Sequence, residues 1–275
     1  MASPSAESTP TRLHYFFGRG LGEQIRFMLA ATGTEWEDCY LREKSDIEAL
    51  RARGVLPWDQ VPLLEIDGRN ITQSMSAVRA LARRSGLYGA SEADAVTCDV
   101  LGDGIRDALG VFVGLPFASD RSAQLETARS RMVGKYLPCV ERALRSNAAV
   151  SDAAKARAEA DSGKNPVLPS VAAEEAEAAG APDLPAPAAD GDGGARVFLV
   201  GGSLTFPDVT LTELLCYVAE TLPEVAATAG ERWPLTVAHQ RMMLGCARMR
   251  AFLSSSHRHP LGDKPYFTEV RKVLD

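Results

Sequence analysis

Hydrophobic positions follow two different periods along the chain, and the change between them divides it into two regions. From residue 11 to residue 88, short apolar runs alternate with helical stretches. Strand-like runs occupy 12–16, 36–41, 61–66 and 69–72, and helical periodicity occupies 21–33, 45–53 and the stretch that begins at 73. Asp67-Gly68, between the last two runs, is a strong hairpin-turn signal. The order predicts an α/β domain (βαβαββα) whose small sheet has parallel and antiparallel neighbours.

Beyond residue 89 the strand-like runs stop and helical patterns take over. These patterns span 93–113, 124–146, 206–221 and 236–254. We place the domain boundary within 87–91 and predict an all-helical second domain over residues 92–275. No apolar run approaches the ~20 residues that a membrane-spanning helix needs, so no membrane contact is expected.

Residues 147–195 differ in composition from the helical region around them. The segment contains 17 alanines, five prolines, five glycines and no aromatic residue. Such a composition cannot bury enough apolar surface to offset the entropy of ordering, so we expect a mostly disordered insertion. A tolerated surface insertion is favoured over a dedicated binding segment. Residues 1–10, rich in serine, proline and alanine, are expected to form a disordered tail.

The charge and the cysteine content limit the partners and the cellular location expected for the chain. The insertion holds nine acidic and three basic residues, a balance of −6 that equals the net charge of the chain. The remainder is neutral, so no basic field indicates a nucleic acid or an anionic membrane as partner. The five cysteines are odd in number, widely spaced and without a C-x-x-C pair, which is typical of a reducing cytoplasmic location.

Tyr15 is the first candidate for chemistry. A tyrosine at the end of a first strand projects into the crevice above the sheet, where open sheets bind ligands. Its phenol, with a reference pKa of about 10, is protonated at neutral pH and can donate a hydrogen bond. Such a bond favours the ionised form of a bound thiol and lowers the pKa of that thiol. The alternative is a strand-end tyrosine that only packs its ring.

In three other segments, the position of a residue within a predicted helix indicates its role. Gln73-Ser74 begins a helix, where free N–H groups suit a carboxylate, although Ser74 can also be a simple N-cap. Gly104 lies inside a predicted helix at a cost of roughly 1 kcal/mol against alanine, which suggests close approach of another chain or helix. Thr205 and Asp208 form an acidic capping box, which we interpret as structural and not catalytic.

Taken in order, these motifs resemble the cytosolic glutathione S-transferases. The stretch Leu13–Arg26 is similar to the T-Y-F-x-x-R-G-x-x-E-x-x-R opening of the tyrosine-using type, most of all the sigma class with its glutathione-dependent prostaglandin D synthases. Asp103–Asp107 resembles the family's D-G-x-x-D stretch, and Gly201–Asp208 its G-x-x-x-[ST]-x-x-D motif. The resemblance implies a thioredoxin-like N-terminal domain, an all-α C-terminal domain and a homodimer.

The resemblance also implies roles for single residues. Tyr15 and Arg19 take the catalytic positions, and a cis peptide is implied at Val61-Pro62. Glutathione is then held by Tyr15, Arg53, Gln60, Val61, Pro62, Gln73 and Ser74, with Asp107 contributed by the partner chain. Arg106 stands where some relatives have a further aspartate, so no metal site is expected.

Two classes of function follow from the resemblance. The first is an enzyme that uses glutathione as co-substrate and attacks a hydrophobic electrophile, with peroxidase or prostaglandin isomerase reactions as side activities. The second is a non-catalytic structural or interaction module of the same fold. Retention of Tyr15, Arg19, Gln73 and Ser74 favours the enzyme, whereas the insertion mildly favours added interactions. The C-terminal run 254–275 is expected to border the second-substrate pocket.

Overall fold

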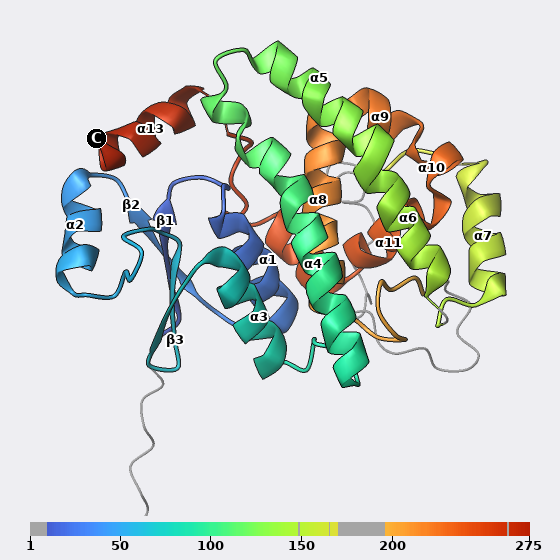
Figure 1. The fold of residues 1–275 in the computed structure, drawn as a ribbon, viewed down its shortest axis with the longest axis horizontal. Helices are drawn as coiled ribbons and strands as arrows, with labels where there is room; N and C mark the ends of the chain where they lie inside the picture. Colours follow the sequence, from blue (N-terminus) through green and yellow to red (C-terminus); the bar gives the residue numbers. More distant parts are fainter. Residues whose placement is uncertain (1–9, 148, 165, 170–195, 263) are drawn as a thin grey trace, which may run out of the picture.

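The computed structural model describes residues 10–147, 149–164, 166–169, 196–262 and 264–275. Residues 1–9 of the expected tail and residues 170–195 of the expected insertion lie outside this set. A small sheet with its helices occupies one side of the molecule, and a larger group of helices occupies the other (Figure 1). The two regions distinguished by hydrophobic period are therefore two bodies packed against each other.

The first region has the predicted element order. Its strands are β1 (Arg12–Phe16), β2 (Glu37–Leu41), β3 (Leu63–Ile66) and β4 (Arg69–Thr72), and its helices are α1 (Gly22–Thr32), α2 (Lys44–Ala52) and α3 (Ser74–Arg84). The strand order is β2-β1-β3-β4. β1 pairs with β2 in parallel, and β3 is antiparallel to both β1 and β4. The βαβαββα prediction is confirmed, and the sheet is of the thioredoxin-like kind.

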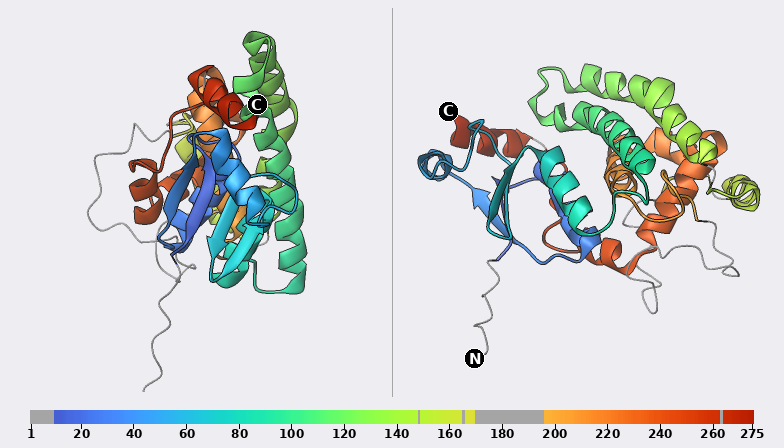
Figure 2. Two further views of the ribbon diagram at one scale, coloured as in Figure 1. Left: turned by 90° about the vertical axis from the view of Figure 1, so that its left-hand side faces the viewer. Right: turned by 60° about the horizontal axis from the view of Figure 1, so that its bottom comes forward.

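The two faces of the sheet are covered by different helices. Leu13 and Leu64 belong to the cluster that α1 and α3 complete, while Phe16 and Leu63 belong to the cluster on the α2 side. The alternation along each strand explains this, since neighbouring side chains point to opposite faces. The last helix, α13 (Lys264–Leu274), joins α2 on that side, as both views of Figure 2 show.

The second region is all-helical, as predicted. Its elements are α4 (Glu92–Val113), the 3₁₀ turn η1 (Leu115–Phe117), α5 (Arg121–Arg131), the π-helical segment η2 (Met132–Tyr136), α6 (Leu137–Ser146), α7 (Asp152–Ser162), α8 (Phe206–Thr221), α9 (Pro223–Ala227), α10 (Ala229–Arg232), α11 (Pro234–Leu244) and α12 (Ala247–Leu253). Among the helices described, none has the length and apolar character needed to cross a membrane.

Two predicted helices differ in detail. The pattern at 124–146 is interrupted by η2, because Pro138 has no N–H for the preceding turn and the helix widens there. The pattern at 236–254 divides into α11 and α12, because Cys246 takes an extended conformation with φ −83° and ψ 135°. The hydrophobic periodicity continues across both breaks. It therefore predicts the buried face of each helix correctly, but it wrongly predicts that each helix is continuous.

Asp208, in the first turn of α8, fixes the centre of the helical region. Its carboxylate accepts hydrogen bonds from the Leu199 N–H at 2.8 Å, and from the Thr205 N–H and hydroxyl at 2.8 and 2.7 Å. His239 Nε2 lies 3.2 Å from the same carboxylate. Asp208 is fully buried, so these partners compensate for its lost hydration. The capping box therefore connects the preceding loop, α8 and α11.

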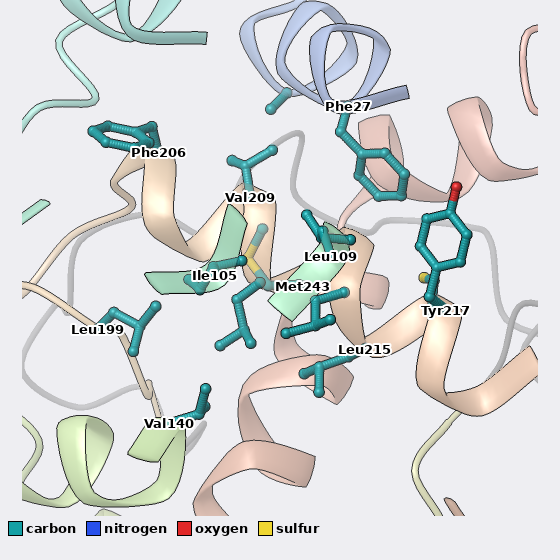
Figure 3. Close-up of a cluster of buried hydrophobic side chains, with 14 of the residues drawn as sticks. Phe27, Ile105, Leu109, Val140, Leu199, Phe206, Val209, Leu215, Tyr217 and Met243 are labelled. Carbon is teal, nitrogen blue, oxygen red and sulfur yellow. The ribbon is translucent and has the colours of Figure 1, made fainter. Parts of the chain in front are cut away.

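Close packing of α4 on α8 depends on Gly102 and not on Gly104. A methyl group built on Gly102 would lie 2.4 Å from the ring of Phe206, whereas no atom of the described residues lies within 4 Å of one built on Gly104. Phe206 begins α8, and its N–H donates to the Leu87 carbonyl at 2.8 Å. Figure 3 shows Phe27 of α1 entering the same apolar cluster as residues of α4 and α8.

The expectation of disorder is wrong for the described beginning of the insertion. Helix α7 folds there and packs against α11 and α10, with Ala154 and Ala158 buried. Beyond it, Leu168 is buried and its N–H donates to the Ala226 carbonyl at 2.9 Å. Small alanine side chains allow close helix contact, so the segment needs less apolar surface than its composition suggested.

A substitution in α7 tests this packing. We expect Ala158→Asp to destabilise the protein by roughly 2 kcal/mol or more, because it places an unpaired charge in a buried helix contact. Ala156→Asp, on the exposed face of the same helix, is the matched control and should change stability little. Urea unfolding measures both, and equal stability of the two variants would show that α7 does not pack in solution.

Candidate functional site

Tyr15 lies at the end of β1, where the chain leaves the sheet. Its ring is buried, and its hydroxyl accepts a hydrogen bond from the Leu21 N–H at 2.9 Å. Two glycines make this approach possible: a methyl group on Gly20 would lie 2.4 Å from the Tyr15 hydroxyl, and one on Gly22 would lie 2.7 Å from its ring. Gly20 also has φ +43°, in the left-handed region that favours glycine. The loop therefore wraps closely around the phenol.

The surroundings keep Tyr15 protonated at neutral pH. Burial raises the pKa of its phenol above the usual value, and the Leu21 N–H, the Tyr266 hydroxyl and the charges of Arg26 and Arg106 offset part of that increase. Arg106 thus acts on the phenol from α4, a role that the sequence analysis did not give it. A buried, protonated phenol with donors on its oxygen is suited to stabilise an anion that accepts its O–H.

Two segments that lie apart in sequence meet beside the first turn of α3. The Val61-Pro62 peptide is cis, as expected. Gln73 Nε2 donates to Gln60 Oε1 at 3.4 Å, so the two side chains meet next to the residue that precedes that peptide. Gln73 has φ 67°, unusual for a residue other than glycine, and the buried Ser74 follows it at the helix start. This arrangement presents helix N–H groups and two amides to one side of the sheet.

Two predicted site residues have other partners in the structure. Arg53 forms an ion pair with Glu65 of β3, so a ligand carboxylate would have to compete with that partner. Arg19 is buried, and its guanidinium lies 2.5 Å from Glu220 and 2.5 Å from the His259 carbonyl. The nearest cationic influences on Tyr15 come from Arg26 and Arg106 instead. Neither position could be foreseen, since both partners are distant in sequence.

Asp107 lies apart from the other candidates. It is exposed on α4, in a groove of about 230 Å³ whose lining includes Val100, Lys135 and Tyr136. Val100 is 67% exposed and lines the same groove as Asp107. The protomer therefore leaves Asp107 and an apolar face available together, away from its own Tyr15.

The C-terminal segment completes the site from the helical side. Arg258 pairs with Glu23 of α1 and with Glu220 of α8, the latter at 2.8 Å. Arg26 lies 3.2 Å from Glu23 and 2.9 Å from Asp38. Beyond this network, α13 returns to the sheet. A cavity beside Arg19 and Gly20 is lined mainly by apolar side chains, namely Phe112, Val113, Leu115, Pro116, Tyr217, Leu261 and Tyr266.

Comparison with known proteins gives one consistent group of relatives. No protein-family model matches the chain. It is 27% identical over 265 residues to bovine glutathione S-transferase A1, covering 95% of this chain and 96% of the relative. It is 29% identical over 266 residues to rat glutathione S-transferase alpha-4, covering 96% and 97%. These names give no support to the sigma-class assignment, which stays a prediction.

Solved structures agree on the fold. The protein NaGST-2 aligns with a TM-score of 0.61 at 19% identity, over 90% of this chain and 97% of that chain. Monomeric Na-GST-3, a glutathione S-transferase from Necator americanus, aligns with a TM-score of 0.62 at 21% identity, over 90% and 98%. The thioredoxin-like sheet followed by a helical domain is the shared architecture.

The C-terminal segment also predicts a pH dependence of stability. Burial lowers the pKa of His259 to about 4, and the charge of Arg26 contributes to the same effect. The unfolded chain takes up the proton near pH 6.5, whereas the folded chain resists it until about pH 4. This contribution to stability is therefore complete above pH 6.5 and is lost progressively as the pH falls towards 4.

Unfolding in urea between pH 7 and pH 4 measures the effect, and His259→Gln should flatten the decline. Tyr40→Phe is the control, because it removes the hydroxyl that lies 3.1 Å from His259 Nε2 and retains the titrating ring. Identical pH profiles for the wild type and His259→Gln would contradict the assignment.

Proposed function

Because the relatives that it matches over nearly its full length are glutathione S-transferases, we propose that the chain belongs to this family and conjugates the thiolate of glutathione to hydrophobic electrophiles. The observation that carries the proposal is the buried, protonated phenol of Tyr15 at the end of β1, beside residues suited to a peptide ligand. A free thiol has a pKa near 8.5 and is a weak nucleophile until it ionises. A donor aimed at the sulfur favours the ionised form.

Tyr15 is proposed to donate its proton in a hydrogen bond to the glutathione sulfur. The proton lost by the thiol goes to water, and the thiolate remains as acceptor of the phenol O–H. Each unit by which the pKa of the thiol falls corresponds to roughly 1.4 kcal/mol of preferential stabilisation of the anion. The thiolate then attacks the electrophile. Arg19 is proposed to contribute to the local field through the Glu220 pair and not by direct contact.

The tripeptide is proposed to lie along β3 and the start of α3. The main chain of Val61, ahead of Pro62, would pair with the cysteine residue of glutathione as an added strand does. Gln73, Ser74 and the N–H groups of α3 would bind the γ-glutamyl carboxylate. Gln60 and Arg53 remain candidates for the glycine carboxylate, with Arg53 exchanging Glu65 for the ligand.

The apolar cavity between α4, α8 and α13 has a volume of only about 20 Å³, so we propose that it marks the side of the second substrate and widens to admit it. Its aromatic and aliphatic lining favours a hydrophobic electrophile. We also propose, as side activities of the same thiolate, the reduction of organic peroxides and isomerisation of the prostaglandin kind. The five cysteines are free, which supports the cytoplasmic location proposed for the enzyme.

A homodimer is proposed as the working form. The groove around Asp107 combines a carboxylate with the exposed Val100 of α4, and Val96, four residues earlier on the same helix, is exposed as well. A second copy that covers this face would bring the partner's Asp107 to a glutathione bound by Ser74. The monomeric hookworm relative makes the oligomeric state a property to be measured.

Replacement of Tyr15 tests the catalytic role. We expect Tyr15→Phe to lower the rate of conjugation with a generic aryl halide by at least ten-fold near neutral pH, because the donor to the thiolate is lost. The affinity for glutathione should stay within a few-fold, since most contacts to the tripeptide lie elsewhere. Steady-state kinetics and calorimetric titration measure the two quantities.

An unchanged rate would remove Tyr15 from the mechanism. A wild-type protein that neither binds immobilised glutathione nor conjugates it would instead point to the non-catalytic module. Tyr88→Phe is the matched control, because its hydroxyl bonds to Asp99 at 2.5 Å near the domain boundary and not to the site.

Mixed dimers test the contribution of the partner chain. Asp107→Ala should raise the dissociation constant for glutathione about ten-fold, since a charged hydrogen bond contributes roughly 1.5–3 kcal/mol. In a dimer of one Ser74→Ala chain and one Asp107→Ala chain, both changes fall in the same site and the other site stays intact. Calorimetry should find half of the sites at normal affinity. Equal weakening of both sites would show that Asp107 serves its own chain.

A further inference from the structure

A second phenol lies beside the catalytic candidate. Tyr266 of α13 is buried, and its hydroxyl is hydrogen-bonded to that of Tyr15. A point 2.4 Å from the Tyr15 hydroxyl, where a methyl group on Gly20 would be, is 2.8 Å from the Tyr266 hydroxyl. The two oxygens therefore share the small space above Gly20, although their residues are 251 positions apart in sequence.

Three glycines make room for the ring of Tyr266. Methyl groups built on Gly18 and Gly262 would lie 2.3 and 3.2 Å from its ring carbons, and one on Gly20 would lie 2.8 Å from its hydroxyl. The ring also contacts the Phe117 ring, with centroids 6.2 Å apart. Because two chain segments are shaped to fit this side chain, its position beside Tyr15 is well defined.

The direction of the hydrogen bond follows from what each oxygen offers. Tyr15 accepts the Leu21 N–H at 2.9 Å, which leaves one lone pair and one proton on its oxygen. Burial raises the pKa of Tyr266, and the neighbouring Tyr15 raises it further, so Tyr266 keeps its proton and donates it. The Tyr15 oxygen then accepts two hydrogen bonds, and its own proton remains available for a hydrogen bond to a third group.

Tyr266 approaches Tyr15 from a different side than the residues proposed to hold the tripeptide. It lines the cavity formed with Gly20, Phe112 and Leu261, on the helical side of Tyr15. The residues proposed to hold glutathione, Val61 and Ser74 among them, belong to the β3 and α3 side. The sulfur and Tyr266 can therefore contact the Tyr15 oxygen together.

We propose that Tyr266 is a positioning residue that makes Tyr15 a stronger donor to the glutathione thiolate, through a relay from the Tyr266 hydroxyl to the Tyr15 hydroxyl to sulfur. Two donors on the Tyr15 oxygen stabilise the negative charge that builds up on it as its proton is shared with sulfur. No proton is transferred within the relay, because the thiol has already lost its proton to water. The inference rests on the proposed function and assigns a catalytic purpose to α13.

Tyr266→Phe tests the relay, because it removes one oxygen and keeps the ring that fills the space between the glycines. Titration of the ligand-free protein by ultraviolet absorbance, with Tyr15→Phe identifying the Tyr15 signal, should show the pKa of Tyr15 raised. Titration of the thiolate absorbance in the glutathione complex should show the pKa of the thiol raised by about half a unit to one unit. The rate of conjugation near neutral pH should fall about three- to ten-fold, since one pKa unit is ten-fold in the ionised fraction.

The same variant separates the relay from its alternatives. Tyr88→Phe, which loses a phenol hydrogen bond elsewhere, is the control and should change neither pKa. Unchanged pKa values in Tyr266→Phe, or a lower thiol pKa with a faster rate, would overturn the relay, the latter by showing that Tyr266 obstructs the sulfur. A wild-type complex that shows no thiolate absorbance would instead contradict the proposed function, while the ligand-free titration still tests the Tyr15–Tyr266 bond.

Discussion

A buried network of charges connects the two domains, and the position of Tyr15 depends on it. Arg258 lies between Glu23 of the first domain and Glu220 of the second, and Glu220 also binds Arg19. With Arg26 and Asp38 included, the network contains three carboxylates and three guanidinium groups, so its charges balance. Removing one member of such a set leaves an uncompensated buried charge, which costs about 3–5 kcal/mol. The domain interface is therefore specified by charge pairing as well as by apolar contact.

The network also fixes the loop that surrounds Tyr15. Arg26 donates to the Gly18 carbonyl at 2.9 Å, and Arg19 donates to the His259 carbonyl, so two adjacent residues of the loop between β1 and α1 are held in place. Two residues further along the loop, the Leu21 N–H reaches the phenol oxygen. The carboxyl of Glu213 is buried without a hydrogen-bond partner among the described residues, and burial raises its pKa, which favours its neutral form beside this network.

Local signals in the sequence predicted what depends on local structure. The order of elements in the first domain, the helix start at Gln73-Ser74 and the capping box at Asp208 follow from turns, caps and alternation, and the structure contains each of them. The sequence did not predict that Tyr266 bonds to Tyr15 or that the charge of Arg106 lowers the pKa of Tyr15. Both residues act on Tyr15 across the domain interface. Helix α7 was missed because alanine counts as weakly apolar in composition, although it packs closely between helices.

The pairing of Glu23 with Arg258 also bears on how the chain is made. Ribosomes release the N-terminal domain first, yet its buried carboxylate waits for a guanidinium that emerges 235 residues later. Until then, Glu23 and Arg26 satisfy each other only in part, and the face that α8 will cover remains open to water. The sheet can form early, but the loop around Tyr15 acquires its final shape only after Arg258 has been synthesised. The glutathione site proposed for this chain accordingly needs the second domain as well as the first.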